Sequence, residues 1–148
     1  MPSFHERARQ ALPRLTTENY RVTSPAAWEY NCIAWAAGIT QAWWWPAPGR
    51  YWPDGVPRQE TIAAFVAAFA TLGFDVVTDA HQEADMEKIV LNAEGSTPTH
   101  AARQLANGWW TSKLGSSVDI EHATPDSVAG GAYGEVVAIL GRQSIAAA

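Results

Sequence analysis

The sequence has little charge for its length and only one cysteine. Charged residues make up 17% of its 148 residues, and the formal net charge is −5. A nucleic-acid or anionic-membrane partner favours a basic surface, so we expect neither kind of partner. A single cysteine also excludes an internal disulfide and any zinc site built on several thiolates.

The phosphate-binding and metal-binding motifs are missing as well. No Gly-x-Gly-x-x-Gly, Gly-x-x-x-x-Gly-Lys-Ser/Thr or His-x-x-x-His pattern occurs, so we expect no cofactor and no metal. The N-terminus carries Glu6, Arg7 and Arg9 without the apolar run of a signal peptide, and no stretch is long enough to span a bilayer. We therefore expect one domain over residues 1–148 and a cytoplasmic location, with export without a cleaved signal left open.

Tryptophan is abundant, with eight residues in all, six of them between Trp28 and Trp52. Residues 43–57 also hold four prolines and two glycines, a density that excludes regular structure and predicts a long aromatic loop. Two interpretations of this loop remain open, a lid over the core and a wall of a substrate site. The second assigns substrate contacts to four side chains: Trp43, Trp44, Trp45 and Trp52.

The hydrophobic pattern predicts an α+β domain in which helices precede a mostly antiparallel sheet. The expected helices span residues 4–12, 27–38 and 59–72, and the expected strands span 74–77, 88–93, 99–105, 109–114 and 136–140. Asn107-Gly108 predicts a two-residue hairpin turn that places Ala106 opposite Trp109. Residues 116–134 are expected to be a loop with one helical turn at 125–128.

Cys32 lies near the start of the second expected helix, on an apolar face shared with Trp28, Trp35 and Ile39. The backbone N–H groups and the dipole at a helix N-terminus favour a thiolate, so this position predicts a lowered thiol pKa and a nucleophile. A free cysteine on an apolar face is equally typical of a core residue.

A cysteine hydrolase also needs a histidine that accepts and returns a proton. Of the four histidines, His5 and His81 are expected to face solvent, whereas His100 opens a strand after a turn and can point toward the start of a helix. A surface histidine at a strand end is the alternative for His100. Together with Cys32, it forms the best candidate pair.

The order of these elements resembles that of the papain-like superfamily, and within it the NlpC/P60-type and CHAP-type cysteine hydrolases. The resemblance covers residues 28–115 and rests on Asn31-Cys32-Ile33-Ala34-Trp35 at a helix start and Thr99-His100-Ala101 at a strand start. It implies amide hydrolysis of a peptide, a protein side chain or a cell-wall crosslink. Four segments, at residues 31–36, 43–46, 100–105 and 110–115, also resemble a bacterial family, and this resemblance implies no activity.

The resemblance further implies a third polar residue on the next strand and a polar residue before the nucleophile. In the expected register His100 faces Gly115 and has no suitable partner, so Asp119 is predicted to orient the imidazole, with His122 as the other candidate. Asn31 is predicted to contribute to an oxyanion hole, or else to cap the helix. The function expected is thus a cysteine hydrolase using Cys32, His100 and Asp119. The alternative is a non-catalytic peptide- or glycan-binding module with Cys32 in its core.

Overall fold

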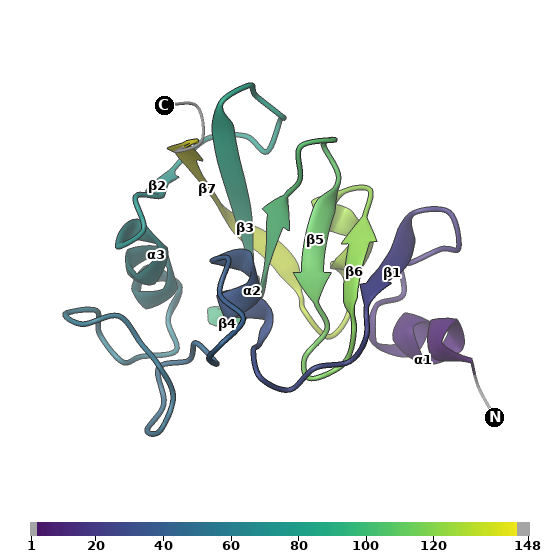
Figure 1. Ribbon diagram of the computed structural model, residues 1–148, viewed down its shortest axis with the longest axis horizontal. Coiled ribbons are helices and arrows are strands. Elements are labelled where there is room, and N and C mark those ends of the chain that lie inside the picture. Colours follow the sequence, from purple (N-terminus) through teal and green to yellow (C-terminus); the bar gives the residue numbers. More distant parts are fainter. Residues whose placement is uncertain (1–2, 145–148) are drawn as a thin grey trace.

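A computed structural model describes residues 3–144 of the chain, and its centre is a seven-stranded sheet (Figure 1). The strand order is β1-β6-β5-β4-β3-β7-β2, and all six pairings are antiparallel. The strands are β1 (Tyr20–Ser24), β2 (Asp75–Val76), β3 (Met86–Glu94), β4 (Thr97–Gln104), β5 (Trp110–Lys113), β6 (Asp119–His122) and β7 (Glu135–Gln143). The helices are α1 (Phe4–Ala11), α2 (Cys32–Ala36), α3 (Ile62–Ala70) and the 3-10 turn η1 (Pro125–Val128). These elements confirm the predicted α+β class.

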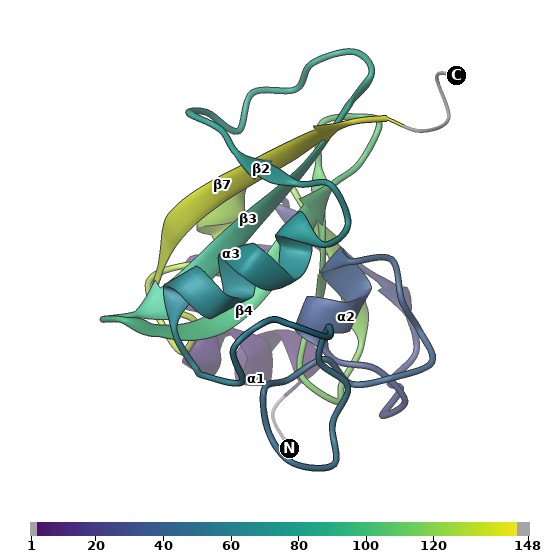
Figure 2. The same cartoon turned by 90° about the vertical axis from the view of Figure 1, so that its left-hand side faces the viewer.

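Helices α2 and α3 pack on one face of the sheet (Figures 1 and 2). That face presents alternate residues of the central strands, Ile89, Leu91, Ala101 and Leu140, to the largest apolar core. Because side chains alternate along a strand, the intervening residues point to the other face. There Val90, Ala102 and Trp110 form a second core, and Ile120 of β6 packs with Leu12, Leu15 and Val128 near α1 and η1.

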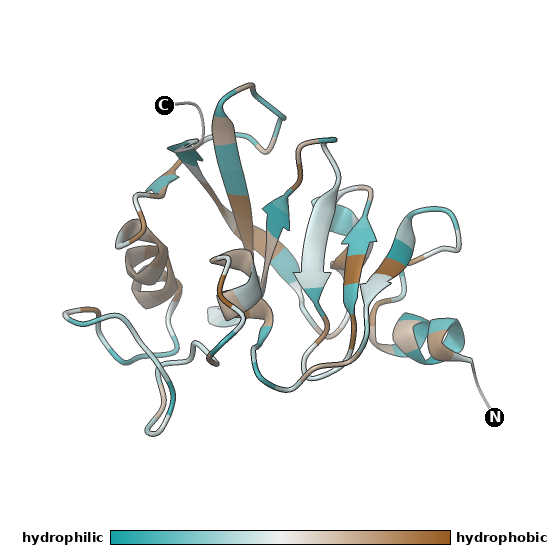
Figure 3. Ribbon diagram, viewed as in Figure 1, coloured by the Kyte–Doolittle hydropathy of each residue, from teal (hydrophilic) through white to brown (hydrophobic). Residues whose placement is uncertain are grey.

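Helix α3 follows directly from its sequence. Thr61 caps it by accepting from the Ala64 N–H at 3.1 Å, and Gly73 follows it with a φ of 93°, a left-handed conformation that glycine adopts readily. Its residues are apolar along its whole length (Figure 3), and Phe65 and Phe69 are fully buried. The predicted helix over 59–72 is thereby confirmed in its central part.

Helix α2 is shorter than the predicted helix over 27–38. The Asn31 side chain accepts from the Ala34 N–H at 3.1 Å, so the helix begins at Cys32. Residues before this cap are not helical, and Trp28 leaves the predicted apolar face with 74% of its surface exposed.

The β4–β5 hairpin has a three-residue turn in place of the predicted two-residue turn. The Leu105 N–H donates to the Trp109 carbonyl at 2.6 Å, and Gly108 adopts a φ of 90° inside the turn. Arg103 therefore pairs with Thr111 and Gln104 with Trp110, one residue away from the predicted register. Because side chains alternate, a one-residue shift exchanges the faces on which every β5 side chain lies.

Strand β6 was expected to be part of a loop. Asp119 and His122, the two candidates for the third catalytic residue, are both fully buried in the strand. The hydrogen-bond partner of the Asp119 side chain, Tyr30, lies 89 residues away along the chain, whereas those of His122 are the nearby Ser112 and Thr124.

Candidate functional site

Cys32 is the first residue of α2 and is 7% exposed. Its Sγ lies 3.9 Å from the carbonyl oxygen of Thr99, the residue before His100 on β4. The predicted position of the thiol at a helix N-terminus is therefore confirmed, and the thiol lies against the strand segment that carries His100.

The pKa of the thiol does not follow the prediction. Burial raises the pKa of Cys32 to about 11, although the backbone N–H groups of Ala101, Ile33 and Cys32 itself, and the Lys113 charge, act to lower it. Here the free-energy cost of removing the thiolate from water exceeds the stabilisation that the helix N-terminus gives it. The predicted lowered pKa is wrong for this closed arrangement, in which the thiol is protonated at neutral pH.

His100 belongs to a chain of buried hydrogen bonds that crosses three strands. Its Nε2 lies 2.9 Å from the Ser112 hydroxyl, which lies 2.7 Å from Nε2 of His122. The Nδ1 of His122 lies 2.7 Å from the carbonyl oxygen of Thr124. His100, Ser112 and His122 each have 0% exposure.

The order of donors in this chain is determined by its last member. A carbonyl oxygen only accepts, so His122 carries its proton on Nδ1 and its Nε2 is an acceptor. The Ser112 hydroxyl donates its single hydrogen to that acceptor, and its oxygen accepts from the Nε2–H of His100. A neutral His100 therefore has a bare Nδ1, which has no hydrogen-bond partner among residues 3–144.

Both imidazoles are neutral near pH 7. Burial and the nearby His122 charge lower the pKa of His100 to about 3. Burial lowers the pKa of His122 to about 4, against the opposing effect of the Thr124 carbonyl. The Tyr133 ring covers His100 in a stack with a centroid distance of 4.0 Å and an interplanar angle of 7°.

The structure brings Cys32 and His100 to the same part of β4 without a hydrogen bond between their side chains. The Nε2 of His100 is engaged with Ser112, and within the described residues its Nδ1 contacts no donor. Ala101 points into the α2 core, and alternation directs His100 toward Ser112 and Tyr133. The Cys32 thiol thus lies against the backbone next to His100, but the two side chains form no hydrogen bond with each other.

Asp119 does not orient His100, and this prediction is wrong. Its Oδ2 accepts from the Tyr30 hydroxyl at 2.7 Å, and Asp119 pairs across the sheet with Lys113. The corrected register places Ser112, and not Lys113, on the face of His100, so Ser112 takes the place predicted for the third residue. Sequence reasoning missed Ser112 for this reason and ranked His122 second.

Asn31 has the capping role that the sequence left open. Its amide oxygen accepts from the N–H groups of Ala34 and Trp44, both at 3.1 Å, and its amide nitrogen donates to the Trp44 carbonyl at 2.9 Å. The side chain joins the start of α2 to the loop over residues 43–57, the tryptophan-rich loop. A second buried amide, Asn92, pairs directly with His100 across β3 and β4, and neither of its polar atoms has a partner within residues 3–144.

The four tryptophans predicted to contact substrate have different surroundings. Trp44 and Trp52 are 4% and 3% exposed and belong to the main core, so their assignment to a substrate wall is wrong. The Trp45 ring packs edge-on against the Phe65 ring, with 5.1 Å between the ring centroids. Trp43 lines a surface cavity of about 260 Å³ together with the exposed Trp28, which the sequence had placed on a helix face.

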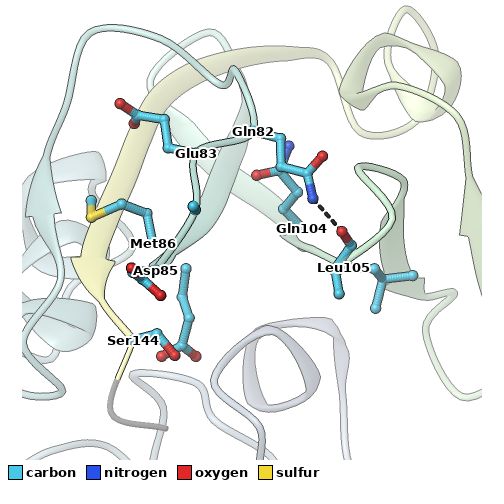
Figure 4. A pocket seen from close by; sticks show the side chains of 10 residues that line it. Gln82, Glu83, Asp85, Met86, Gln104, Leu105 and Ser144 are labelled. Atoms are coloured by element: carbon cyan, nitrogen blue, oxygen red, sulfur yellow. Dashed lines mark hydrogen bonds between the residues drawn. The ribbon is translucent and has the colours of Figure 1, made fainter. Parts of the chain in front are cut away.

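Another cavity, of about 460 Å³, is lined by none of these residues and lies between the 82–87 segment, the end of β4 and Ser144 (Figure 4). Of its three carboxylates, Glu83 pairs with Lys88 and Glu87 with Arg142. It contains neither cysteine nor histidine, so it offers no nucleophile–base pair.

Within residues 3–144, no group of three or more His, Cys, Asp or Glu side chains is placed to hold a metal ion. Over the same residues, no helix has the length and apolar character needed to cross a membrane.

A family model described as "Domain of unknown function (DUF7689)" matches residues 21–141. The matched range includes Cys32, His100, Ser112 and His122. No curated protein and no solved structure matches the chain significantly.

Proposed function

Since the chain belongs to the family described as Domain of unknown function (DUF7689), whose description specifies no activity, we propose from its own residues that it is a cysteine-dependent amide hydrolase with a papain-like arrangement. The observation that carries the proposal is the bare Nδ1 of His100. The Ser112–His122 chain fixes the imidazole in the tautomer that a general base needs, next to the backbone segment against which the thiol rests.

In the proposed reaction, His100 Nδ1 accepts the thiol proton and the Cys32 sulfur attacks the carbonyl carbon of an amide. The imidazolium then gives its proton to the departing amine, which leaves a thioester on Cys32. A water molecule, deprotonated by the same Nδ1, attacks the thioester and releases a carboxylic acid and the free thiol. Peptide, protein side-chain and cell-wall amides all suit these steps.

The resting state is a neutral thiol and a neutral imidazole with no hydrogen bond between them, in contrast to a preformed ion pair. The high pKa of Cys32 and the low pKa of His100 make proton transfer unfavourable while both groups are buried. Substrate binding must therefore uncover the thiol, which is 7% exposed, and bring it to Nδ1.

Acyl transfer from p-nitrophenyl acetate tests the proposal when the reaction is quenched with acid before the thioester hydrolyses, because the acetyl group on Cys32 is then read by mass spectrometry. We expect one acetyl group on Cys32 of the native protein, none in Cys32→Ser, and a rate at least about a hundredfold lower in His100→Gln, the loss typical of a missing general base. His81→Gln, which changes an exposed histidine, is the matched control. Equal acetylation of Cys32 in the native protein and in His100→Gln would contradict the proposal.

The buried thiol favours a second candidate, a non-catalytic binding module in which Cys32 is a core residue. The acyl donor p-nitrophenyl acetate distinguishes the two, because the proposed enzyme exposes its thiol only when substrate binds. A thiol that stays unacetylated in the native protein, and reacts only after unfolding, supports the binding module.

A further inference from the structure

The cavity of about 260 Å³ is formed where the segment before α2 meets the tryptophan-rich loop. Trp28 and Tyr51, which line it, are 74% and 49% exposed and are among the five large apolar side chains most exposed in the described chain. Exposed aromatic side chains gathered around one cavity are typical of a binding site.

The loop that carries this cavity is held in place by its own contacts. The Tyr51 N–H donates to the Trp43 carbonyl and the Trp45 N–H to the Tyr51 carbonyl, both at 3.1 Å. Arg58 donates to the Ala47 carbonyl at 3.1 Å and fixes the tip of the loop. Trp43 and Tyr51 are therefore positioned before any ligand arrives, which lowers the entropy cost of binding.

Trp43 presents ring surface to the cavity and no free donor. Its Nε1–H donates to the Trp28 carbonyl at 2.5 Å, and the Arg50 guanidinium lies over its ring at 4.8 Å from the centroid. The polar groups of the cavity are the exposed side chains of Glu29, Gln41 and Arg50. They supply an acceptor, an amide that both donates and accepts, and a planar set of donors.

From this combination we infer that the cavity binds a neutral pyranose unit of a glycan. Hydroxyl groups both donate and accept, as this polar set requires, and the apolar face of a sugar ring stacks on aromatic rings such as Trp28 and Tyr51. Glu29 and Arg50 carry opposite charges, which favours a neutral ligand.

The site does not depend on Cys32, so it goes beyond the proposed function and can be tested separately. We would titrate the native protein by calorimetry with three neutral tetrasaccharides: chitotetraose, cellotetraose and maltotetraose. Tetra-alanine serves as the peptide probe. The variants are Trp28→Ala and Tyr51→Ala, with Trp109→Ala as a control, because Trp109 is half-buried at the distant β4–β5 turn.

We expect at least one tetrasaccharide to bind, with the affinity lowered about tenfold or more in Trp28→Ala and in Tyr51→Ala and unchanged in Trp109→Ala and Cys32→Ser. The inference is overturned if no tetrasaccharide binds at millimolar concentration, or if both cavity variants bind as tightly as the native protein. It is also overturned if tetra-alanine alone binds with the same dependence on Trp28, which would assign the cavity to a peptide.

Discussion

Ser112 and Lys113 are neighbours on β5, yet they belong to two buried polar clusters of opposite character. Ser112 joins two neutral histidines in a chain in which every donor has an acceptor. Lys113 faces the other side of the strand, where its ammonium lies 5.1 Å from the centroid of the Tyr30 ring and opposite Asp119.

The two clusters satisfy their polar groups in different ways. In the histidine cluster each hydrogen bond is directional and determines the tautomer of the next ring. In the lysine cluster, charge compensation acts at a distance, because Lys113 and Asp119 form no direct ion pair among the described residues and Lys113 donates to the Ser117 carbonyl. The first arrangement suits proton transfer, whereas the second suits electrostatic compensation of a buried charge.

Breaking the lysine cluster, formed by Lys113, Asp119 and Tyr30, should have the largest effect on stability. Asp119→Asn keeps the shape of the side chain but leaves the buried Lys113 without its nearest counter-charge, which should lower the free energy of unfolding by about 3 kcal/mol. Urea denaturation measures this loss. The double variant Asp119→Asn/Lys113→Met should recover most of it, and a double variant as unstable as the single one would show that the two charges do not compensate each other.

Breaking the histidine cluster should lower the stability less than breaking the lysine cluster, but it should also slow the reaction of Cys32. Ser112→Ala leaves the Nε2 atoms of His100 and His122 buried without a partner, which should lower the free energy of unfolding by about 2 kcal/mol. It also frees His100 to place its proton on Nδ1, so acetylation of Cys32 should slow. Ser117→Ala removes a hydroxyl from the next loop and is the control. If Cys32 of Ser112→Ala were acetylated as fast as in the native protein, the hydrogen bonds from His100 through Ser112 to His122 would play no part in the reaction.

The two clusters should also differ in their response to acid. His100 and His122 have native pKa values of about 3 and 4, below the unfolded value of about 6.5, so the unfolded state binds more protons between these limits. Stability from this source is complete above pH 6.5 and falls with decreasing pH, by up to about 1.4 kcal/mol per pH unit for each histidine.

Urea midpoints measured from pH 7.5 to 4.5 test this response. The slope should be about half as steep in His122→Gln as in the native protein. If both proteins lose stability at the same rate, His122 is not a buried neutral group.

The smallest effect should come from an ion pair at the surface, which provides the reference for both clusters. Arg21 donates to Glu121 at 2.6 Å between β1 and β6, but its side chain is 69% exposed. Arg21→Ala should therefore lower the free energy of unfolding by only about 0.5 kcal/mol. A loss as large as that of Ser112→Ala would mean that the edge pairing of β1 depends on this contact.

The sequence predicted the parts of the fold that depend on local pattern. The apolar run of α3 and its stop at Gly73, the hairpin at Asn107-Gly108 and the position of Cys32 at a helix start are all present. The length of the β4–β5 turn could not be predicted from the sequence, because two-residue and three-residue turns both place glycine in a left-handed conformation.

That one-residue difference decides which residue meets His100, so the predicted site failed at its third member. The partners of Asp119 could not be read from the sequence either, since the Tyr30 hydroxyl that it binds lies 89 residues away. Trp28 was misplaced because its spacing suits a helix that the Asn31 cap prevents from starting earlier.

The buried state of Cys32 also determines how the protein meets oxidants. Burial raises the pKa of the thiol to about 11, so the thiol is protonated at pH 7, and peroxide reacts with the thiolate. The closed protein therefore resists conversion of Cys32 to a sulfenic acid. As the sole cysteine of the chain, Cys32 also has no resolving partner, so any oxidation that occurs while the thiol is uncovered must be reversed by a thiol from another molecule.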